Sequence, residues 1–141
     1  MKILKTLAVA AALIATLTPA KAGTLADYEK ATERALQNAT ANLILTPSKV
    51  RPDLTGVTVL WQIENNSDVQ YKAVNWECAV FYNSEPVNAG LLWAQRIPAK
   101  GRVFVEESYS FHEIDYNAPK AVAPSAFKFE CRMTWANDGS F

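Results

Sequence analysis

The feature that most constrains this chain is a pair of stretches in which apolar and polar residues alternate around a central cysteine. Successive side chains of a β-strand point to opposite faces, so such alternation predicts a strand with one face turned to a core. In the first stretch the apolar set is Val74, Trp76, Cys78, Val80 and Tyr82. In the second it is Phe127, Phe129, Cys131, Met133 and Trp135.

These two cysteines are the only ones in the chain, and each lies in the middle of an apolar face. In an exported protein this placement predicts a Cys78–Cys131 disulfide, because such bonds persist in oxidising compartments. Chain-entropy estimates give a bond that closes a loop of this length about 4 kcal/mol of stabilisation. The alternative is two buried thiols that never meet. A redox role is disfavoured because the chain has no Cys-x-x-Cys pair.

Residues 1–22 have the three parts of a secretory signal peptide. Two lysines make a positive start, residues 7–17 form an apolar run, and Ala20-Lys21-Ala22 supplies small residues for signal peptidase. The alternative is a membrane anchor, but a span needs about 20 apolar residues, and this run is shorter. We expect cleavage before Gly23 and a periplasmic or secreted mature chain with no membrane span.

Loss of the signal peptide changes the charge balance. It would leave 11 of the 14 basic residues against all 14 acidic ones. The resulting negative charge disfavours nucleic acid and anionic lipid as partners, because both bind basic patches. The remaining chain is long enough for one domain with one core.

The mature chain begins with the pattern of a helix. Apolar residues recur at three- and four-residue spacing over residues 24–43, with Thr24 and Asp27 as a capping box. We expect this helix to pack on the domain edge or, alternatively, to bind a partner. Pro47 and Pro52 break the pattern, so residues 44–55 are expected to be a linker.

Short strands separated by turn clusters follow, which favours an antiparallel β-sandwich with an N-terminal helix. We divide the chain into a signal peptide (1–22), the helix and linker (23–55), and a β-sandwich domain (56–141). Strands are predicted at residues 57–64, 71–82, 91–97, 102–107 and 127–135. The predicted core contains Val57, Val59, Trp61, Trp76, Val80, Phe129 and Trp135.

Turn signals precede and follow the strand that contains Val74 to Tyr82: Ile63-Glu64-Asn65-Asn66-Ser67 before it, and Pro98 to Gly101 after it. This arrangement resembles the bacterial FxLYD-type immunoglobulin-like domains. In that family, a strand ending in an asparagine turn precedes a Phe-x-Leu-Tyr-Asp strand, and a Pro-Gly turn follows. Phe81-Tyr82-Asn83 is similar to the Leu-Tyr-Asp part, whereas Ala79 replaces the Phe and the Pro-Gly turn is two residues longer. The resemblance, over about residues 56–107, implies an immunoglobulin-like sandwich without defined catalytic residues.

Residues for catalysis or metal binding are few. The single histidine, His112, would have to serve any Ser-His-Asp triad, but nearby acidic residues would favour its charged form. The same acidic residues could hold calcium, although they do not have the spacing of a known calcium loop. Metal binding by this segment is therefore kept as an alternative. Zinc would need more ligands, and there is no glycine-rich phosphate loop. We predict no catalytic residue and no cofactor.

Aromatic and acidic residues gather in the segment from Tyr109 to Tyr116. Loops beside a rigid sandwich commonly carry binding residues, and aromatic side chains commonly anchor interfaces. We therefore predict a binding surface at Tyr109, Phe111, His112 and Tyr116. The alternative is that these rings cover the open end of the sandwich.

Together these observations predict an exported immunoglobulin-like binding module for a protein or envelope component. One alternative is a structural accessory subunit that docks on an envelope assembly through its N-terminal helix. The other is a small hydrolase, for which no carboxylate pair is singled out.

Overall fold

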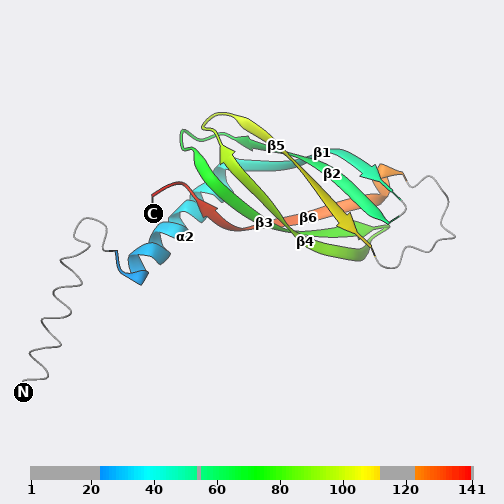
Figure 1. Ribbon diagram of the computed structural model, residues 1–141, viewed down its shortest axis with the longest axis horizontal. Helices are drawn as coiled ribbons and strands as arrows, with labels where there is room; N and C mark the ends of the chain where they lie inside the picture. Colours follow the sequence, from blue (N-terminus) through cyan, green and yellow to red (C-terminus); the bar gives the residue numbers. More distant parts are fainter. Residues whose placement is uncertain (1–22, 54, 112–122, 141) are drawn as a thin grey trace, which may run out of the picture. The chain divides into compact units, whose positions relative to one another are not determined.

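The computed structural model describes residues 23–53, 55–111 and 123–140 (Figure 1). The predicted signal peptide, His112 and Tyr116 lie outside the described residues. The elements, in chain order, are α2 (Leu25–Asn42), β1 (Leu43–Pro52), β2 (Gly56–Asn65), β3 (Tyr71–Tyr82), β4 (Glu85–Ile97), β5 (Arg102–Ser110), the 3-10 turn η1 (Pro124–Ala126) and β6 (Phe127–Asn137). The chain divides into two compact units, Met1–Lys30 and Ala31–Phe141, and every described strand lies in the second.

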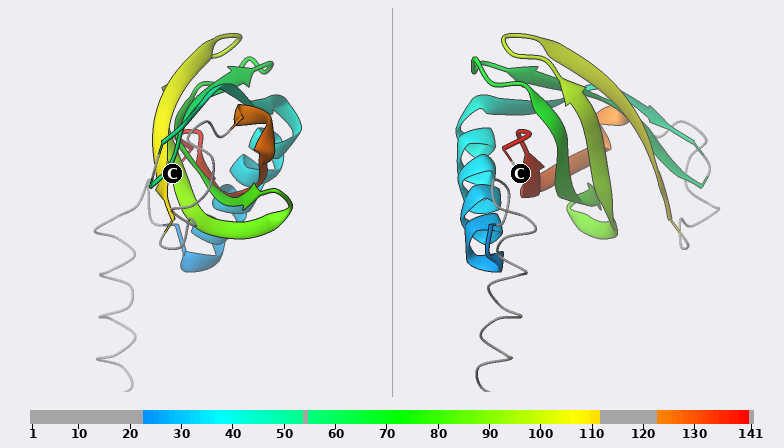
Figure 2. Two further views of the ribbon diagram at one scale, coloured as in Figure 1. Left: turned by 90° about the vertical axis from the view of Figure 1, so that its right-hand side faces the viewer. Right: turned by 60° about the vertical axis from the view of Figure 1, so that its left-hand side comes forward.

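Two three-stranded antiparallel sheets form the predicted β-sandwich (Figures 1 and 2). The strand order is β1-β2-β5 in one sheet and β4-β3-β6 in the other. Strands β4 and β5 lie next to each other across the two sheets, where Asn88 Nδ2 donates to the carbonyl of Ser110 at 2.6 Å. At the opposite side of the sandwich, β1 and β6 each pair with a single neighbour among the described strands, and we call the other edge of each its free edge.

The predicted alternation places most of the expected core correctly. Five of the residues expected in the core are buried: Val57, Val59, Trp61, Trp76 and Val80. Phe129 is partly buried and meets Trp61 edge to face, with ring centroids 5.3 Å apart. The hydrophobic faces of β2, β3 and β6 therefore meet between the sheets, as the period-two pattern requires.

Trp135 is not a core residue, because a bulge in β6 reverses the faces. Asn75 of β3 is opposite Trp135, but the next residue, Trp76, is opposite Met133, so one residue of β6 is extra. Beyond that point Ala136 is buried, while Trp135 stacks on Trp93 of β4 at 5.5 Å between ring centroids. Trp93 is 45% exposed, so this pair lies on the outer face of its sheet.

The segment that we expected to be a linker contains strand β1, so the prediction for residues 44–55 was wrong. Leu43–Pro52 pair with β2 along their length, with a register shift between Pro47 and Lys49. Proline is tolerated here because β1 is an edge strand, and a residue facing the free edge needs no ladder hydrogen bond. The sandwich therefore begins at Leu43 and not at residue 56.

The N-terminal helix is present, and its two parts fall in different units. In the first unit, Thr24 and Asp27 form the predicted capping box: Asp27 N–H donates to Thr24 Oγ1 at 3.2 Å, and Thr24 N–H donates to Asp27 Oδ2 at 3.0 Å. In the second unit, Ala35 and Ala39 are fully buried in the core. Their small side chains let this part of the helix approach the core closely, which confirms helix packing against the domain.

The predicted disulfide joins β3 to β6. Cys78 and Cys131 are bonded, are directly opposite each other in the same sheet, and have Cα atoms 4.1 Å apart. Among the described residues there is no free cysteine. The bond therefore ties together two strands that are 53 residues apart in the sequence.

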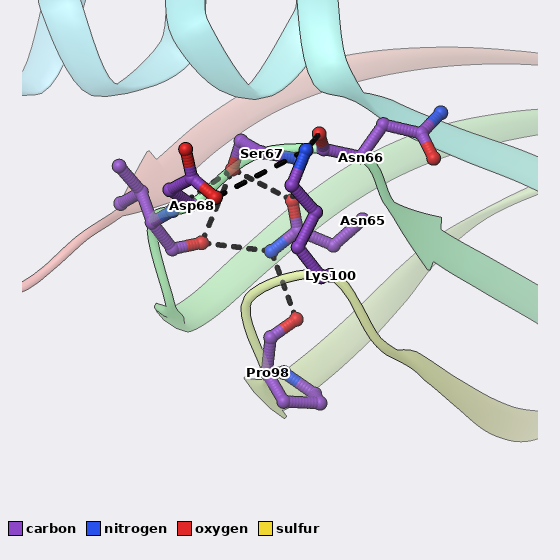
Figure 3. Close-up of polar contacts among 7 residues, drawn as sticks. Asn65, Asn66, Ser67, Asp68, Pro98 and Lys100 are labelled. Carbon is purple, nitrogen blue, oxygen red and sulfur yellow. Dashed lines mark hydrogen bonds and ion pairs between the residues drawn. The ribbon is translucent and has the colours of Figure 1, made fainter.

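Asn65, at the end of β2, connects two turns (Figure 3). Its side-chain amide donates to the carbonyl of Val69 at 2.8 Å and to that of Pro98 at 3.0 Å. Its Oδ1 accepts from the backbone N–H of Ser67 at 3.0 Å and from the Ser67 hydroxyl at 2.7 Å. The residue is 1% exposed, so its polar atoms are buried with their partners in place.

Candidate functional site

The two described residues of the predicted aromatic surface, Tyr109 and Phe111, belong to the buried core, so the prediction is wrong for these two and stays a prediction for His112 and Tyr116. Tyr109 is 3% exposed and lies 6.3 Å from Phe129, measured between ring centroids. Phe111 is 8% exposed, stacks on Phe127 at 5.8 Å, and donates its backbone N–H to the Thr55 carbonyl at 2.7 Å. The alternative reading, in which these rings cover the sandwich, therefore holds for both.

Burial also affects the chemistry of the Tyr109 hydroxyl. It raises the pKa of Tyr109 above the ordinary value, and the charge of Glu107 adds to this effect, while the neighbouring Trp61 indole opposes it. Burial therefore favours the neutral phenol, as expected for a side chain packed in the core.

A groove of about 410 Å³ opens between the free edges of β1 and β6. It extends inward from the edge of the sandwich to the indoles of Trp61 and Trp76. The other lining residues come from β1, β6 and the end of α2: Thr40, Leu43, Ile44, Leu45, Pro47, Phe129, Cys131 and Met133. None of these side chains is ionisable, since Cys131 is in the disulfide.

The size of the groove is within the range of ligand sites, and its lining side chains, apart from Thr40, are apolar. Ligand sites are mostly apolar clefts of about 300–1,000 Å³, and this groove lies within that range. Thr40 marks one end, where its hydroxyl lies 3.8 Å from the Met133 sulfur. At the start of β6, η1 contacts β1. The structure therefore has a groove lined by β6 residues on one side and β1 residues on the other.

The backbone of β6 is available along this groove. The Cα separation of 4.1 Å across Cys78 and Cys131 is the short spacing of a non-hydrogen-bonded pair in an antiparallel ladder. The N–H and C=O groups of Cys131 therefore point away from β3, toward the free edge. Because the pattern repeats every second residue, the same holds for Phe129 and Met133, whose side chains also line the groove.

The outer face of β6 carries charges of alternating sign. Lys128, Glu130 and Arg132 are exposed and alternate with the groove-lining residues. Arg132 Nη2 lies 2.9 Å from Glu77 Oε2 on the neighbouring strand β3. The free edge thus has an apolar inner side and a charged outer side with a defined order.

The calcium alternative depended on acidic residues that include Glu106 and Glu107. Glu106 Oε2 instead lies 2.7 Å from Arg51 Nη2 on β1, in an exposed ion pair. In the described part of the chain, no three His, Cys, Asp or Glu residues lie close enough together to hold a metal ion. The other acidic residues of that segment, Glu113 and Asp115, lie outside the described residues.

We compared the chain with protein-family models, with curated proteins and with solved structures, and none of the three comparisons found a match. Among the described helical residues, there is also no helix with the length and hydropathy to cross a membrane.

Proposed function

We propose that the mature chain is an exported, non-catalytic binding module that holds an apolar segment of a partner protein in the groove between β1 and β6. The observation that carries the proposal is the groove itself. It combines a volume of about 410 Å³, lining side chains without ionisable groups, and two strand edges that no other strand pairs with in the described part of the chain. A lining of this kind binds by burying apolar surface and supplies no acid, base or nucleophile.

The proposal includes export of the chain from the cytosol. The Cys78–Cys131 disulfide supports it, because such bonds form and persist outside the reducing cytosol. The signal-peptide pattern of residues 1–22 supports it independently. Expression of the full chain in a bacterial host, followed by N-terminal sequencing of the periplasmic fraction, should yield a chain that begins at Gly23. A cytosolic, uncleaved product with two alkylatable thiols would contradict export.

We also propose that the sandwich is immunoglobulin-like and related to the FxLYD-type domains. In the immunoglobulin fold, strand B pairs with E and strand C pairs with F, and here β2 pairs with β5 and β3 pairs with β6. The two turns on which the resemblance depends are linked by the hydrogen bond from Asn65 to Pro98. The disulfide departs from the antibody pattern, because it joins adjacent strands of one sheet instead of bridging the two sheets.

A charge placed in the groove tests the binding function. Pro47 lines the groove and is exposed enough to accept a larger side chain. Pro47→Glu would set a carboxylate against apolar surface, where desolvation disfavours ligand binding. Thr46→Glu is the matched control, because Thr46 is the exposed neighbour on the other face of the same strand.

The probe is a phage-displayed library of random linear peptides selected on the wild-type chain. We expect the selected peptides to bind Pro47→Glu at least about tenfold more weakly than wild type, and to bind Thr46→Glu with unchanged affinity. Both variants should melt close to the wild-type temperature. Failure to select any peptide would contradict the proposed groove function. So would peptides whose affinity is the same for the wild type and both variants.

A further inference from the structure

We propose that the occupant of the groove is an extended polypeptide segment that pairs with β6 as an added strand. The side chains of this segment that lie opposite Lys128, Glu130 and Arg132 are acidic, basic and acidic, in that order. This inference rests on the proposed function and adds the conformation and charge pattern of the partner.

The backbone of β6 provides the first argument. At Phe129, Cys131 and Met133 the N–H and C=O groups point to the free edge, and the side chains line the groove. A ligand without a backbone, such as an acyl chain, would fill the apolar space and leave this row of donors and acceptors unpaired. An extended peptide satisfies both features at once, as in other cases where a strand adds to a sheet edge.

β6, and not β1, is the edge suited to pairing. Pro47 lacks an N–H, and the register shift between Pro47 and Lys49 interrupts β1. In contrast, β6 runs without a bulge from Phe127 to Met133. The added strand would therefore be about seven residues long, or roughly 20 Å, with β1 as the opposite wall.

The topology supports the same position. In the immunoglobulin fold strand F lies between C and G. The pairing of β3 with β6 makes β6 the counterpart of F, and within the described residues no strand occupies its other side. The partner segment would take the place that strand G has in that fold.

The outer face of β6 specifies the charge pattern. Side chains directly opposite each other on neighbouring strands are close enough for opposite charges to attract and like charges to repel. The order Lys128, Glu130, Arg132 therefore selects acidic, basic, acidic on the added strand. This order is symmetric, so the charges fit either strand direction, and the place of strand G makes the added strand antiparallel to β6. A second copy of β6 in the centred antiparallel register would instead place Lys128 opposite Arg132 and Glu130 opposite Glu130.

Two peptides that share the same inward-facing valines and differ in the order of their charges test the charge pattern. The first is acetyl-Val-Glu-Val-Lys-Val-Glu-Val-amide, and the control is acetyl-Val-Lys-Val-Glu-Val-Lys-Val-amide. We expect the first to bind the mature chain about tenfold more tightly, measured by calorimetry at low salt. In the triple variant Lys128→Glu/Glu130→Lys/Arg132→Glu, the preference should reverse.

Backbone methylation tests the strand pairing. In the antiparallel added strand, the valines opposite Phe129, Cys131 and Met133 direct their N–H groups to β6, whereas the N–H of the central lysine faces away from it. Methylation of the two central valine nitrogens should abolish binding, and methylation of the lysine nitrogen should leave it within about twofold. On peptide binding, amide hydrogen exchange should slow at Phe129, Cys131 and Met133 and stay unchanged at Glu130, whose N–H faces β3.

The outcomes separate this inference from the function on which it rests. Equal affinity for both peptides and no effect of methylation, together with weaker binding to Pro47→Glu, would retain the groove and overturn strand pairing. A stable homodimer by light scattering, with the amides of β6 already protected, would assign the edge to a second copy. That result would also overturn the inference.

Discussion

Replacement of one atom of Asn65, its side-chain nitrogen, by oxygen should lower the stability of the fold strongly. The side chain of Asn65 is buried and makes four hydrogen bonds, two as donor and two as acceptor. Three of them lie within the β2–β3 turn, and the bond to Pro98 joins this turn to the β4–β5 turn. Asn65→Asp keeps the shape and both acceptor bonds but removes the two donors. The carbonyls of Val69 and Pro98 would then face a carboxylate oxygen.

The expected loss follows from these contacts. Each lost hydrogen bond contributes about 1 kcal/mol net, and each buried carbonyl left unsatisfied adds about 1 kcal/mol or more. The desolvated carboxylate adds to this cost. We therefore expect the free energy of unfolding to fall by about 3–4 kcal/mol at pH 7, which corresponds to a decrease in Tm of roughly 10 °C or more.

Urea denaturation and calorimetry of the mature chain measure this loss. Asn66→Asp is the matched control, because the neighbouring Asn66 is exposed, and it should change stability by less than about 0.5 kcal/mol. Protonation restores a donor to the new carboxyl. Burial and the two carbonyls would raise its folded-state pKa above the unfolded value of about 4. The stability difference from wild type should therefore shrink as the pH is lowered toward 4. Equal, small effects of the two substitutions would refute the reasoning.

Three further predictions concern the disulfide, a turn and a buried phenol. Replacement of both Cys78 and Cys131 by serine should lower the free energy of unfolding by about 4 kcal/mol, and a reductant should have the same effect on wild type alone. Ser84→Gly should raise it by about 1 kcal/mol in chemical denaturation, because Ser84 has a φ of 69° that glycine adopts without strain; a decrease would contradict this. Burial raises the pKa of Tyr109, so the folded state retains a proton that the unfolded state loses, and stability should fall above about pH 10. Tyr109→Phe should make that alkaline decrease shallower in melting curves recorded from neutral to alkaline pH.

Of the candidate site, the sequence predicted the disulfide and little else. Cys78 and Cys131 were identifiable because each sits at the centre of an alternating strand, which is a local pattern. Tyr109 and Phe111 were expected at a binding surface but are buried, because composition does not say which side of a strand is covered. Tyr109 is inward because β5 continues to Ser110 and pairs Tyr109 with Val57 of β2.

The sequence alone determined which stretches are strands with a buried face, and hence the sandwich. The reason is that side-chain alternation is a property of the strand itself and needs no knowledge of its neighbours. It could not place Trp135, because the bulge that turns this residue outward exists only in the pairing with β3. It also missed β1, because prolines that would end a central strand are acceptable at an edge, and whether a strand is at an edge depends on the whole sheet.

The groove, like the position of Trp135 and the strand β1, could not be predicted from the sequence alone. In the sequence, Phe129 and Met133 have the pattern of ordinary inward strand residues, and Leu45 falls in the segment that was expected to be a linker. They line a site only because the strand order leaves β1 and β6 as facing free edges, while β4 and β5 close the other side. Strand order is set by the long-range packing of the two sheets, so only the tertiary structure could decide where this protein has a surface open to a partner.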